Sequence, residues 1–183
     1  MAEVYQPLNI TTDKAKRCLM MMWVDVNLDF SDPGNHTPEW EVIGRGTEEA
    51  YIELDYDEET TTDILCITET VVNNVTESMS LDPFYAKRGS KLWAILDHRL
   101  SMKEYSEFNF PILTAKFYKG ASGNYEAYVD SKCSIRPQSL GGSSYMDMPI
   151  DVTFGGAREH GTVSNIVTDP EKETPVFTPK LQP

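Results

Sequence analysis

Residues 43–83 read IGRGTEEAYIELDYDEETTTDILCITETVVNNVTESMSLDP, and this stretch decides the fold class of the chain. Residues 47–63 hold eight carboxylates and no Lys or Arg. Apolar and acidic residues alternate at the centre of the segment: Ile52, Glu53, Leu54, Asp55, Tyr56 and Asp57. Consecutive side chains of a strand point to opposite faces of its sheet. We therefore expect a strand with one apolar face and one face that carries three negative charges.

A second strand is expected directly after the first. The polar segment DEETTTD at 57–63 predicts a turn. From residue 64 to about residue 77, the many Thr and Val residues favour a strand over a helix. This second strand carries two more carboxylates, Glu69 and Glu77.

Strand patterns also occupy most of the remaining chain. Apolar residues recur at every second position from 18 to 30 and predict a long, half-buried strand. Extended patterns follow at 40–43, 108–118, 125–135, 145–154 and about 163–167. Pro149 has no N–H to donate, so we expect the strand at 145–154 to lie at a sheet edge or to contain a bulge.

One helix is predicted at about residues 90–101, with Ser90 as its N-cap. Its apolar residues fall at helical spacing and form one stripe: Leu92, Trp93, Ile95, Leu96 and Leu100. This stripe should pack on a sheet. Seven or eight strands with one helix indicate a mainly β fold, a β-sandwich or barrel-like domain with a flanking helix.

The length of 183 residues fits one domain, which we place at residues 1–168. Residues 1–15 have no hydrophobic pattern and predict an extended arm at the start of that domain. The spaced prolines of residues 169–183 exclude a helix and predict an extended C-terminal arm.

The formal net charge of −13 predicts that the chain repels DNA, because nucleic-acid binding depends on Lys and Arg. No apolar run approaches the ~20 residues that span a bilayer, and the first residues do not resemble a signal peptide. We therefore expect synthesis and retention in a cytoplasm. The three cysteines, Cys18, Cys66 and Cys133, are expected to be buried thiols of a reducing compartment.

The sequence contains none of the catalytic or metal-binding motifs we sought. His36, His98 and His160 are isolated from other ligand types, so we expect no catalytic residue, no metal and no cofactor. The acidic cluster could supply a hydrolase carboxylate pair or bind a hard cation, but such charge runs are most often solvated faces. A sugar-binding platform is a further alternative, formed by Trp23, Trp40 and Trp93.

The order of the elements resembles that of a known family. WEVIG at 40–44 leads through the acidic strand to DILCITETV at 63–71, VTESMSLDP at 75–83 and the predicted helix. SLGG at 139–142, the alternating residues 146–154 and the glycine pair at 155–156 continue the pattern. Over roughly residues 15–165, the chain is similar to the major tail protein, or tail tube protein, of tailed bacteriophages. Leu65 and Cys66 depart from this pattern, because a small residue is expected there.

This resemblance implies a structural protein without catalytic activity. Such subunits have a β-sandwich or barrel-like fold with one flanking helix, and they form hexameric rings that stack into a tube. The implied location is the virion tail, after assembly in the cytoplasm of a host bacterium. The implied partners are other copies of the chain, a tape-measure protein, and tail-tip and terminator proteins. DNA would pass through the lumen without specific binding, and no segment would span a membrane.

Five acidic residues are candidates for the lumen wall: Glu53, Asp55, Asp57, Glu69 and Glu77. Negative charge on that wall would keep DNA from binding to it. Two alternatives stay open. One is another phage or bacteriocin tail protein, such as a terminator, a decoration protein or the inner tube of a contractile tail. The other is a carbohydrate-binding or acid-dependent hydrolytic β-domain.

Overall fold

The computed structural model describes residues 20–28, 36–44, 47, 50–121, 124–164 and 174–180. These residues form nine strands and one helix, in this order along the chain: β1 (Met20–Asp25), β2 (Trp40–Ile43), β3 (Glu53–Thr62), β4 (Thr68–Leu81), α1 (Lys91–Met102), β5 (Asn109–Ala121), β6 (Asn124–Pro137), β7 (Ile150–Thr153), β8 (Arg158–Ser164) and β9 (Val176–Pro179). The fold is mainly β, as the sequence predicts. Within the described residues, no helix is long and apolar enough to cross a membrane.

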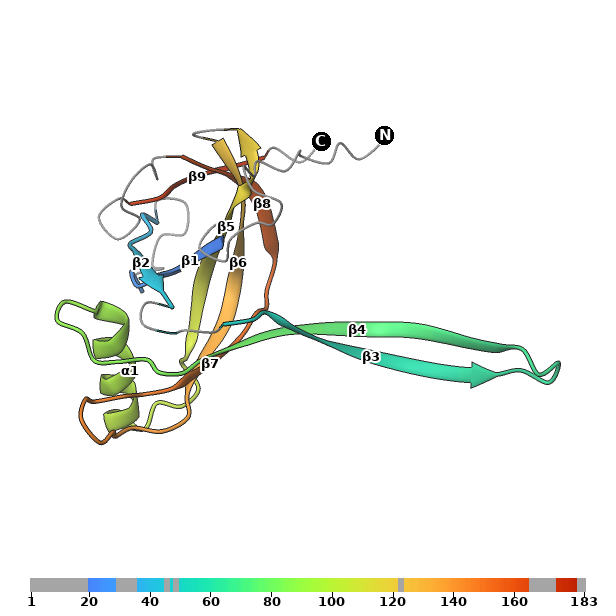
Figure 1. Cartoon of the computed structure of the whole chain (residues 1–183), viewed down its shortest axis with the longest axis horizontal. Coiled ribbons are helices and arrows are strands. Elements are labelled where there is room, and N and C mark those ends of the chain that lie inside the picture. The colour runs from blue at the N-terminus through green and yellow to red at the C-terminus, as the bar shows by residue number, and fades with distance from the viewer. Residues whose placement is uncertain are drawn as a thin grey trace.

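All nine strands belong to one antiparallel sheet (Figure 1). The order of neighbouring strands is β2, β1, β5, β6, β7, β4, β3, while β8 pairs with β6 and β9 pairs with β8. Strand β6 pairs with two different strands along the same edge: its residues 125–130 pair with β8 and its residues 134–137 pair with β7. The sheet therefore forks along β6, and one branch of the fork continues into β4 and β3.

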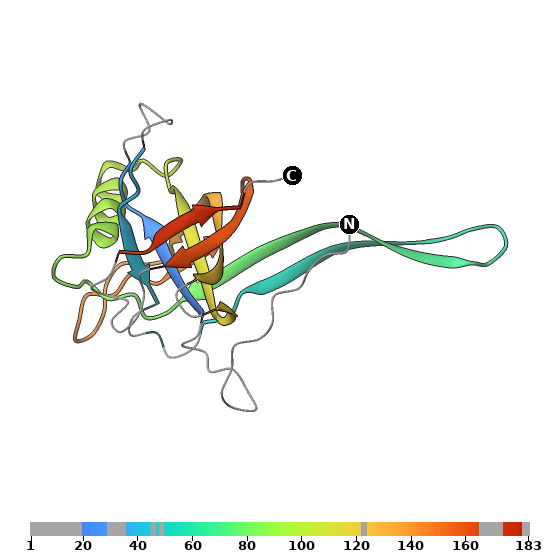
Figure 2. The ribbon, with the colours of Figure 1, turned by 90° about the horizontal axis from the view of Figure 1, so that it is seen from above.

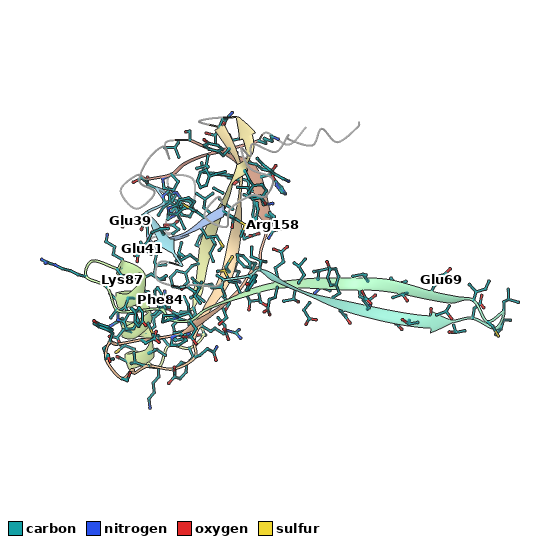
Figure 3. The ribbon with its side chains drawn as sticks, in the orientation of Figure 1. Glu39, Glu41, Glu69, Phe84, Lys87 and Arg158 are labelled. Atoms are coloured by element: carbon teal, nitrogen blue, oxygen red, sulfur yellow. The ribbon has the colours of Figure 1, made fainter. Side chains whose placement is uncertain are left out.

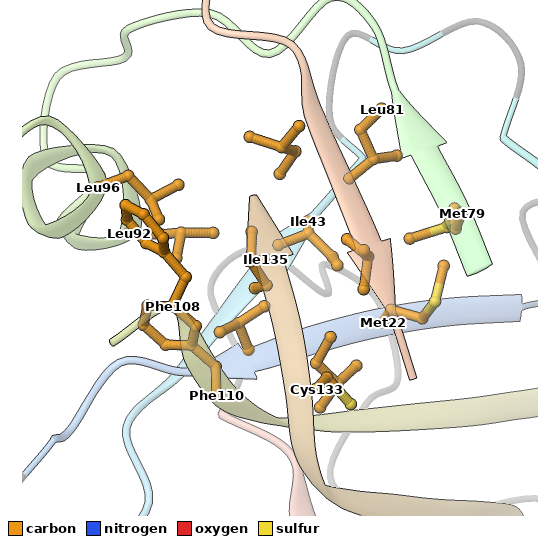
Figure 4. Close-up of a cluster of buried hydrophobic side chains, with 14 of the residues drawn as sticks. Met22, Ile43, Met79, Leu81, Leu92, Leu96, Phe108, Phe110, Cys133 and Ile135 are labelled. Carbon is orange, nitrogen blue, oxygen red and sulfur yellow. The ribbon is translucent and has the colours of Figure 1, made fainter. Parts of the chain in front are cut away.

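The larger apolar cluster lies between α1 and one face of the sheet (Figure 4). Met22 and Val24, two positions apart on β1, point into it, and so do Leu92 and Leu96 of α1, which have no exposed surface. The other members of the predicted helical stripe are partly buried against the same cluster: Trp93, Ile95 and Leu100. Burying each apolar side chain of this size stabilises the folded state by about 1.5–3 kcal/mol relative to leaving it exposed. This packing holds α1 on the sheet.

The N-terminus of α1 is attached to β2 through Glu41. Ser90 is the N-cap, and its Oγ accepts a hydrogen bond of 3.2 Å from the Trp93 amide. The Glu41 carboxylate accepts from Ser90 Oγ at 2.5 Å and from the amides of Lys91 and Leu92 at 2.8 and 2.9 Å. A carboxylate is favoured here because the N-terminal amides of a helix carry partial positive charge.

A second apolar cluster lies on the other face of the sheet. Its buried members are Trp23, Leu113, Ala115, Ala127 and Val163. Trp40 of β2 and Phe177 of β9 pack against it, whereas Trp93 packs against the cluster under α1. The three tryptophans therefore do not form a shared sugar-binding platform.

Strand β7 differs from the strand predicted at 145–154. It contains only residues 150–153, lies between β6 and β4, and pairs with both without a register shift, so the prediction of an edge strand or a bulge is wrong. Pro149 precedes the strand and removes no ladder hydrogen bond. Asp147 holds the preceding loop by accepting a hydrogen bond of 2.9 Å from the Phe84 amide. Met146 consequently leaves the alternation and is 52% exposed, while Met148 is buried.

The two predicted arms lie largely outside the described residues. Residues 1–15 are outside them, as are 169–173 and 181–183. Residues 176–179 of the predicted C-terminal arm form β9, which pairs with residues 161–164 of β8. This part of the arm is extended, and it belongs to the sheet.

Candidate assembly surface

Strands β3 and β4 form a hairpin that projects from the body of the molecule (Figures 1 and 2). Strand β4 pairs with β7 only over residues 78–81, whereas residues 68–77 pair with β3 alone. Every residue of β3 is exposed, and so are residues 68–76 of β4. Ten strand residues at about 3.3 Å each extend roughly 33 Å. The hairpin is therefore an arm with both faces open to solvent.

The first strand of the hairpin is longer than predicted. Residues 57–62 were expected to form a turn, but they continue β3. Hydroxyl groups pair across the strands at Thr60 and Thr70 and at Thr62 and Thr68, with 3.1 Å between the oxygens of each pair. β-Branched Thr suits a strand, and cross-strand hydroxyl pairs stabilise one. The run of three threonines therefore extends the strand.

The turn lies at residues 63–67. Oδ1 of Asp63 accepts hydrogen bonds of 2.7 and 3.0 Å from the amides of Leu65 and Ile67. Bonding of this local kind is the reason that Asp favours turns. Cys66 has a φ of 61°, in the left-handed region where glycine is least strained. This is one of the two positions at which the resemblance led us to expect a small residue.

The tip of the hairpin is apolar and exposed. Ile64 is 99% exposed, Leu65 is 72% exposed and Ile67 is 55% exposed. Cys66 is exposed as well, so the expectation of a buried thiol is wrong for this residue. Cys133 is buried, and Cys18 lies outside the described residues.

One face of the hairpin collects four of the five predicted lumen residues. Glu53, Asp55 and Asp57 alternate along β3, and Glu59 and Thr61 continue that alternation. Thr61 pairs directly with Glu69 of β4, and directly paired residues share a face. We define the acidic face by its carboxylates: Glu53, Asp55, Asp57, Glu59 and Glu69. Glu59 was not predicted, because residues 57–63 were assigned to a turn.

The opposite face of the hairpin is apolar near its base. Leu54 and Tyr56 point to this face and are 48% and 51% exposed. Val75 pairs with Tyr56 across the strands and is 39% exposed, and Val72 is 48% exposed. The alternation of the sequence therefore produces the expected apolar face, and that face remains open to solvent.

Glu77 is separate from the acidic face. It pairs with Leu54 across the strands, so it lies on the apolar face at the base of the hairpin. Its carboxylate accepts two hydrogen bonds from Arg158, at 3.0 Å from Nη1 and at 2.6 Å from Nη2. The charge of Glu77 is compensated within the chain.

Arg158 connects three strands at the fork of the sheet. Besides binding Glu77 of β4, its Nε and Nη2 donate to Asp130 of β6 at 2.7 and 3.0 Å. Its guanidinium also lies 4.4 Å from the centre of the Tyr128 ring. The hydrogen bonds with Glu77, and then those with Asp130, raise the pKa of Arg158. No local sequence pattern identifies this cluster, because Arg158 lies 28 residues from Asp130 and 81 from Glu77.

The histidines occupy three different environments. Nε2 of His36 is 2.6 Å from Oδ2 of Asp25, the His160 ring is 6.0 Å from the Tyr128 ring, and His98 is exposed. In the described part of the chain, no three His, Cys, Asp or Glu side chains are grouped so that they could hold a metal ion.

Two solved structures contain chains similar to this one in fold. The first is the sheath-tube complex of an extracellular contractile injection system, PVC, in its extended state. That match has 8% identity and a TM-score of 0.46, and it covers 84% of this chain and 95% of the other. The second is the anti-feeding prophage cap, described as the AFP tube terminating cap. It has 9% identity, a TM-score of 0.45, and coverage of 84% and 94% respectively. No protein-family model matches the chain, and no curated protein matches it in sequence.

Proposed function

We propose that this chain is a structural subunit without enzymatic activity, which associates with copies of itself as stacked hexameric rings and forms a virion tail tube. The proposal depends mainly on one observation, the free-standing hairpin with an open apolar face and an apolar tip. The order of the sequence elements, which resembles that of tail tube proteins, supports the same function.

The hairpin has the properties of a segment that is completed by a partner. Nine large apolar side chains between residues 51 and 75 are at least 39% exposed. A two-stranded hairpin alone is at best marginally stable in water, and large exposed apolar patches mark interaction surfaces. A second copy that covers the hairpin would stabilise it and would bury its apolar face.

A projecting hairpin that binds a different surface of the next copy produces rings or filaments. A contact between two different surfaces of identical subunits closes into a ring when the rotation allows it, and otherwise continues as a filament. The exposed outer edge of β3 also offers unpaired backbone groups, which favour pairing with another chain. A stack of rings combines the two kinds of contact: one closes each ring, and the other continues from ring to ring along the axis.

The acidic face gives such a tube a lining that does not bind DNA. Its five carboxylates lie on a hairpin that contains no Lys or Arg. Facing the lumen, they would repel phosphate groups, so that DNA slides past. The tube would be completed by a tape-measure protein and by tail-tip and terminator proteins.

Negative-stain microscopy of the concentrated protein tests this proposal. We expect rings or tubes of uniform width. A variant in which Asn-Gly replaces residues 55–76 should fold but remain monomeric, because the paired residues Leu54 and Glu77 then flank the two-residue turn and the projecting part of the hairpin is removed. If the full chain stays monomeric at high concentration, and also with its tail-tip initiator, the proposal is wrong.

Neutralising carboxylates of the acidic face tests their effect on DNA passage separately from the assembly of the subunits. The variant Glu53→Gln/Asp55→Asn/Asp57→Asn should still form rings, because the apolar face and the tip are unchanged. In a reconstituted particle, DNA ejection should be slower. If the substitutions instead abolish sugar binding or hydrolysis and leave ejection unchanged, a carbohydrate-active domain is the better explanation.

A further inference from the structure

The hairpin is attached to the body of the molecule through a short segment at its base. Strand β4 pairs with β7 over residues 78–81, and two of these residues are buried in the larger apolar cluster. Glu77 is the next residue toward the tip, and residues 68–76 beyond it are all exposed. Figure 3 shows Arg158 where the hairpin leaves the body and Glu69 near the far end of the hairpin. Glu77 therefore lies at the point where the hairpin leaves the sheet.

The backbone contacts at this point hold the hairpin within the plane of the sheet. The amide of Phe154, directly after β7, donates a hydrogen bond of 2.9 Å to the carbonyl oxygen of Glu77. Hydrogen bonds between strands lie in the plane of the sheet, whereas side chains stand perpendicular to it. The backbone contacts therefore resist movement of the hairpin within that plane. Movement out of the plane has to be resisted by side chains.

The side chain of Glu77 supplies such a contact. Its two carboxylate oxygens accept hydrogen bonds from Nη1 and Nη2 of Arg158 at 3.0 and 2.6 Å, a two-point geometry that fixes orientation as well as distance. Arg158 is itself held by the carboxylate of Asp130, whose side chain is 4% exposed, and lies over the ring of Tyr128. The Glu77 side chain thus connects the base of the hairpin to a buried point of the sheet.

We infer that Glu77 sets the angle at which the hairpin projects, and that the hairpin needs this angle to associate with the next copy. Glu77 is a positioning residue, because it acts through the direction of the hairpin. The inference rests on the proposed function, in which the hairpin is the segment that associates. Ten residues beyond Glu77 span roughly 33 Å, so a tilt of about 10° at the base would move the tip by roughly 6 Å. That displacement exceeds the spacing of about 4.8 Å between paired strands, so a tilted hairpin would lose its contact.

The same contact determines how the two faces of the hairpin are turned. Glu77 reaches Arg158 from the apolar face, so at the base this face is turned toward β8 and the acidic face is turned away from β8. A substitution of Glu77 leaves all five carboxylates of the acidic face in the sequence. An effect of that substitution on association therefore does not come from a loss of charge on the proposed lining.

Distance measurements on the unassembled chain test the inference. Spin labels on the native Cys66 at the tip and on Arg136→Cys, an exposed position of β6, report the direction of the hairpin by pulsed electron paramagnetic resonance. Cys18→Ser removes one further thiol, and Cys133 is buried. The distance distribution should be narrow in this background. Adding Glu77→Ala should broaden it by roughly the 6 Å expected for the displaced tip.

Glu58→Ala is the matched control. Glu58 is exposed and, like Glu77, belongs to the face opposite the acidic face, where it pairs with Val72. Its substitution removes an equal charge nearer the tip and leaves the contact between Glu77 and Arg158 in place, so the distribution should keep its width. Circular dichroism of each variant in the same buffer checks that the sheet is folded, so that unfolding does not account for a broader distribution.

Light scattering of the unlabelled chain measures association. If about one tenth of the hairpins of Glu77→Ala hold the associating angle, the protein concentration needed for assembly should rise about tenfold. Glu58→Ala should leave that concentration unchanged. The inference is wrong if Glu77→Ala keeps the narrow distribution, and also if it broadens the distribution but assembles as the unaltered chain does. If the unaltered chain does not assemble, the proposed function fails together with the role of Glu77 in association, and the distance distributions alone decide whether Glu77 sets the angle.

Discussion

Replacing Arg158 by Met should lower the free energy of unfolding by about 3 kcal/mol. Arg158 makes four hydrogen bonds to two carboxylates, and the Asp130 side chain is only 4% exposed. Met keeps most of the apolar stem of the side chain and removes the charge. The variant therefore leaves a buried carboxylate without its cation.

The magnitude follows from the exposure of the three groups. Removing one partner of a buried ion pair costs about 3–5 kcal/mol. The side chain of Arg158 is 31% exposed and that of Glu77 is 26% exposed, so water screens part of the interaction. Glu77 can be hydrated after the change, whereas Asp130 cannot, and we therefore expect a value at the lower end of the range.

Urea unfolding measures this effect through the fluorescence of the buried Trp23 and the half-buried Trp40 and Trp93. With a slope of about 2 kcal/mol per molar urea, the midpoint should fall by about 1.5 M. In a thermal melt, the midpoint should fall by roughly 6–12 °C. The control Lys132→Met removes an exposed cation from β6 and should change the free energy of unfolding by no more than about 0.5 kcal/mol.

A variant that neutralises the whole cluster tests the reason for the loss. In Arg158→Met/Asp130→Asn/Glu77→Gln no buried charge lacks a partner, so at least about half of the lost stability should return. The reasoning is refuted if Arg158→Met is within about 0.5 kcal/mol of the unaltered chain. It is also refuted if the triple variant is no more stable than Arg158→Met.

Two further predictions concern α1 and the thiols. Glu41→Ala should lower the free energy of unfolding in urea by about 2 kcal/mol, because three hydrogen-bond donors at the start of α1 lose their acceptor. The control Glu39→Ala should be nearly neutral, because it removes only an exposed ion pair with Lys91. Equal losses of stability for the two variants would contradict this prediction. A maleimide should label exposed Cys66 in the native protein at pH 7.5 and spare Cys133 until unfolding, as read by peptide mass mapping, because burial raises the pKa of Cys133 to about 12. Equal labelling of the two thiols in the native protein would contradict this assignment. Because the pKa of the Cys133 thiol is higher in the folded state than its ordinary value of 9.0, the protonated thiol should stabilise the fold fully below pH 9. This stabilisation should decrease as the pH rises toward 12.

The local patterns of the sequence predicted the secondary structure well where packing agrees with them. The alternation around Met22 and Val24 and the helical stripe around Leu92 and Leu96 correspond to β1 and α1. These periods are properties of consecutive residues, so they can be read without knowledge of the fold. Where a local contact competes, the pattern fails. Met146 continues the alternation in sequence, yet it lies in a loop and is exposed.

The candidate site was predicted in part. The alternation of Glu53, Asp55 and Asp57 was sufficient to place them on one face, but the turn assigned to residues 57–63 concealed Glu59. Placing Glu69 on that face, and Glu77 on the other, requires the pairing of β3 with β4, including the register shift between Asp57 and Glu58. A shift of one residue moves a side chain to the opposite face, and single-strand periodicity contains no information about it.

By itself, the sequence determined a mainly β chain, a segment of alternating acidic and apolar residues, and a strongly negative charge, because these depend on composition and on neighbours along the chain. Only the tertiary structure decided that this segment is a projecting arm, that its apolar side is open to solvent, and that Glu77 belongs to Arg158. Those outcomes depend on contacts between residues as far as 81 positions apart. Burial and charge pairing are set by which surfaces the fold brings together, and alternation alone specifies two faces without specifying what covers either of them.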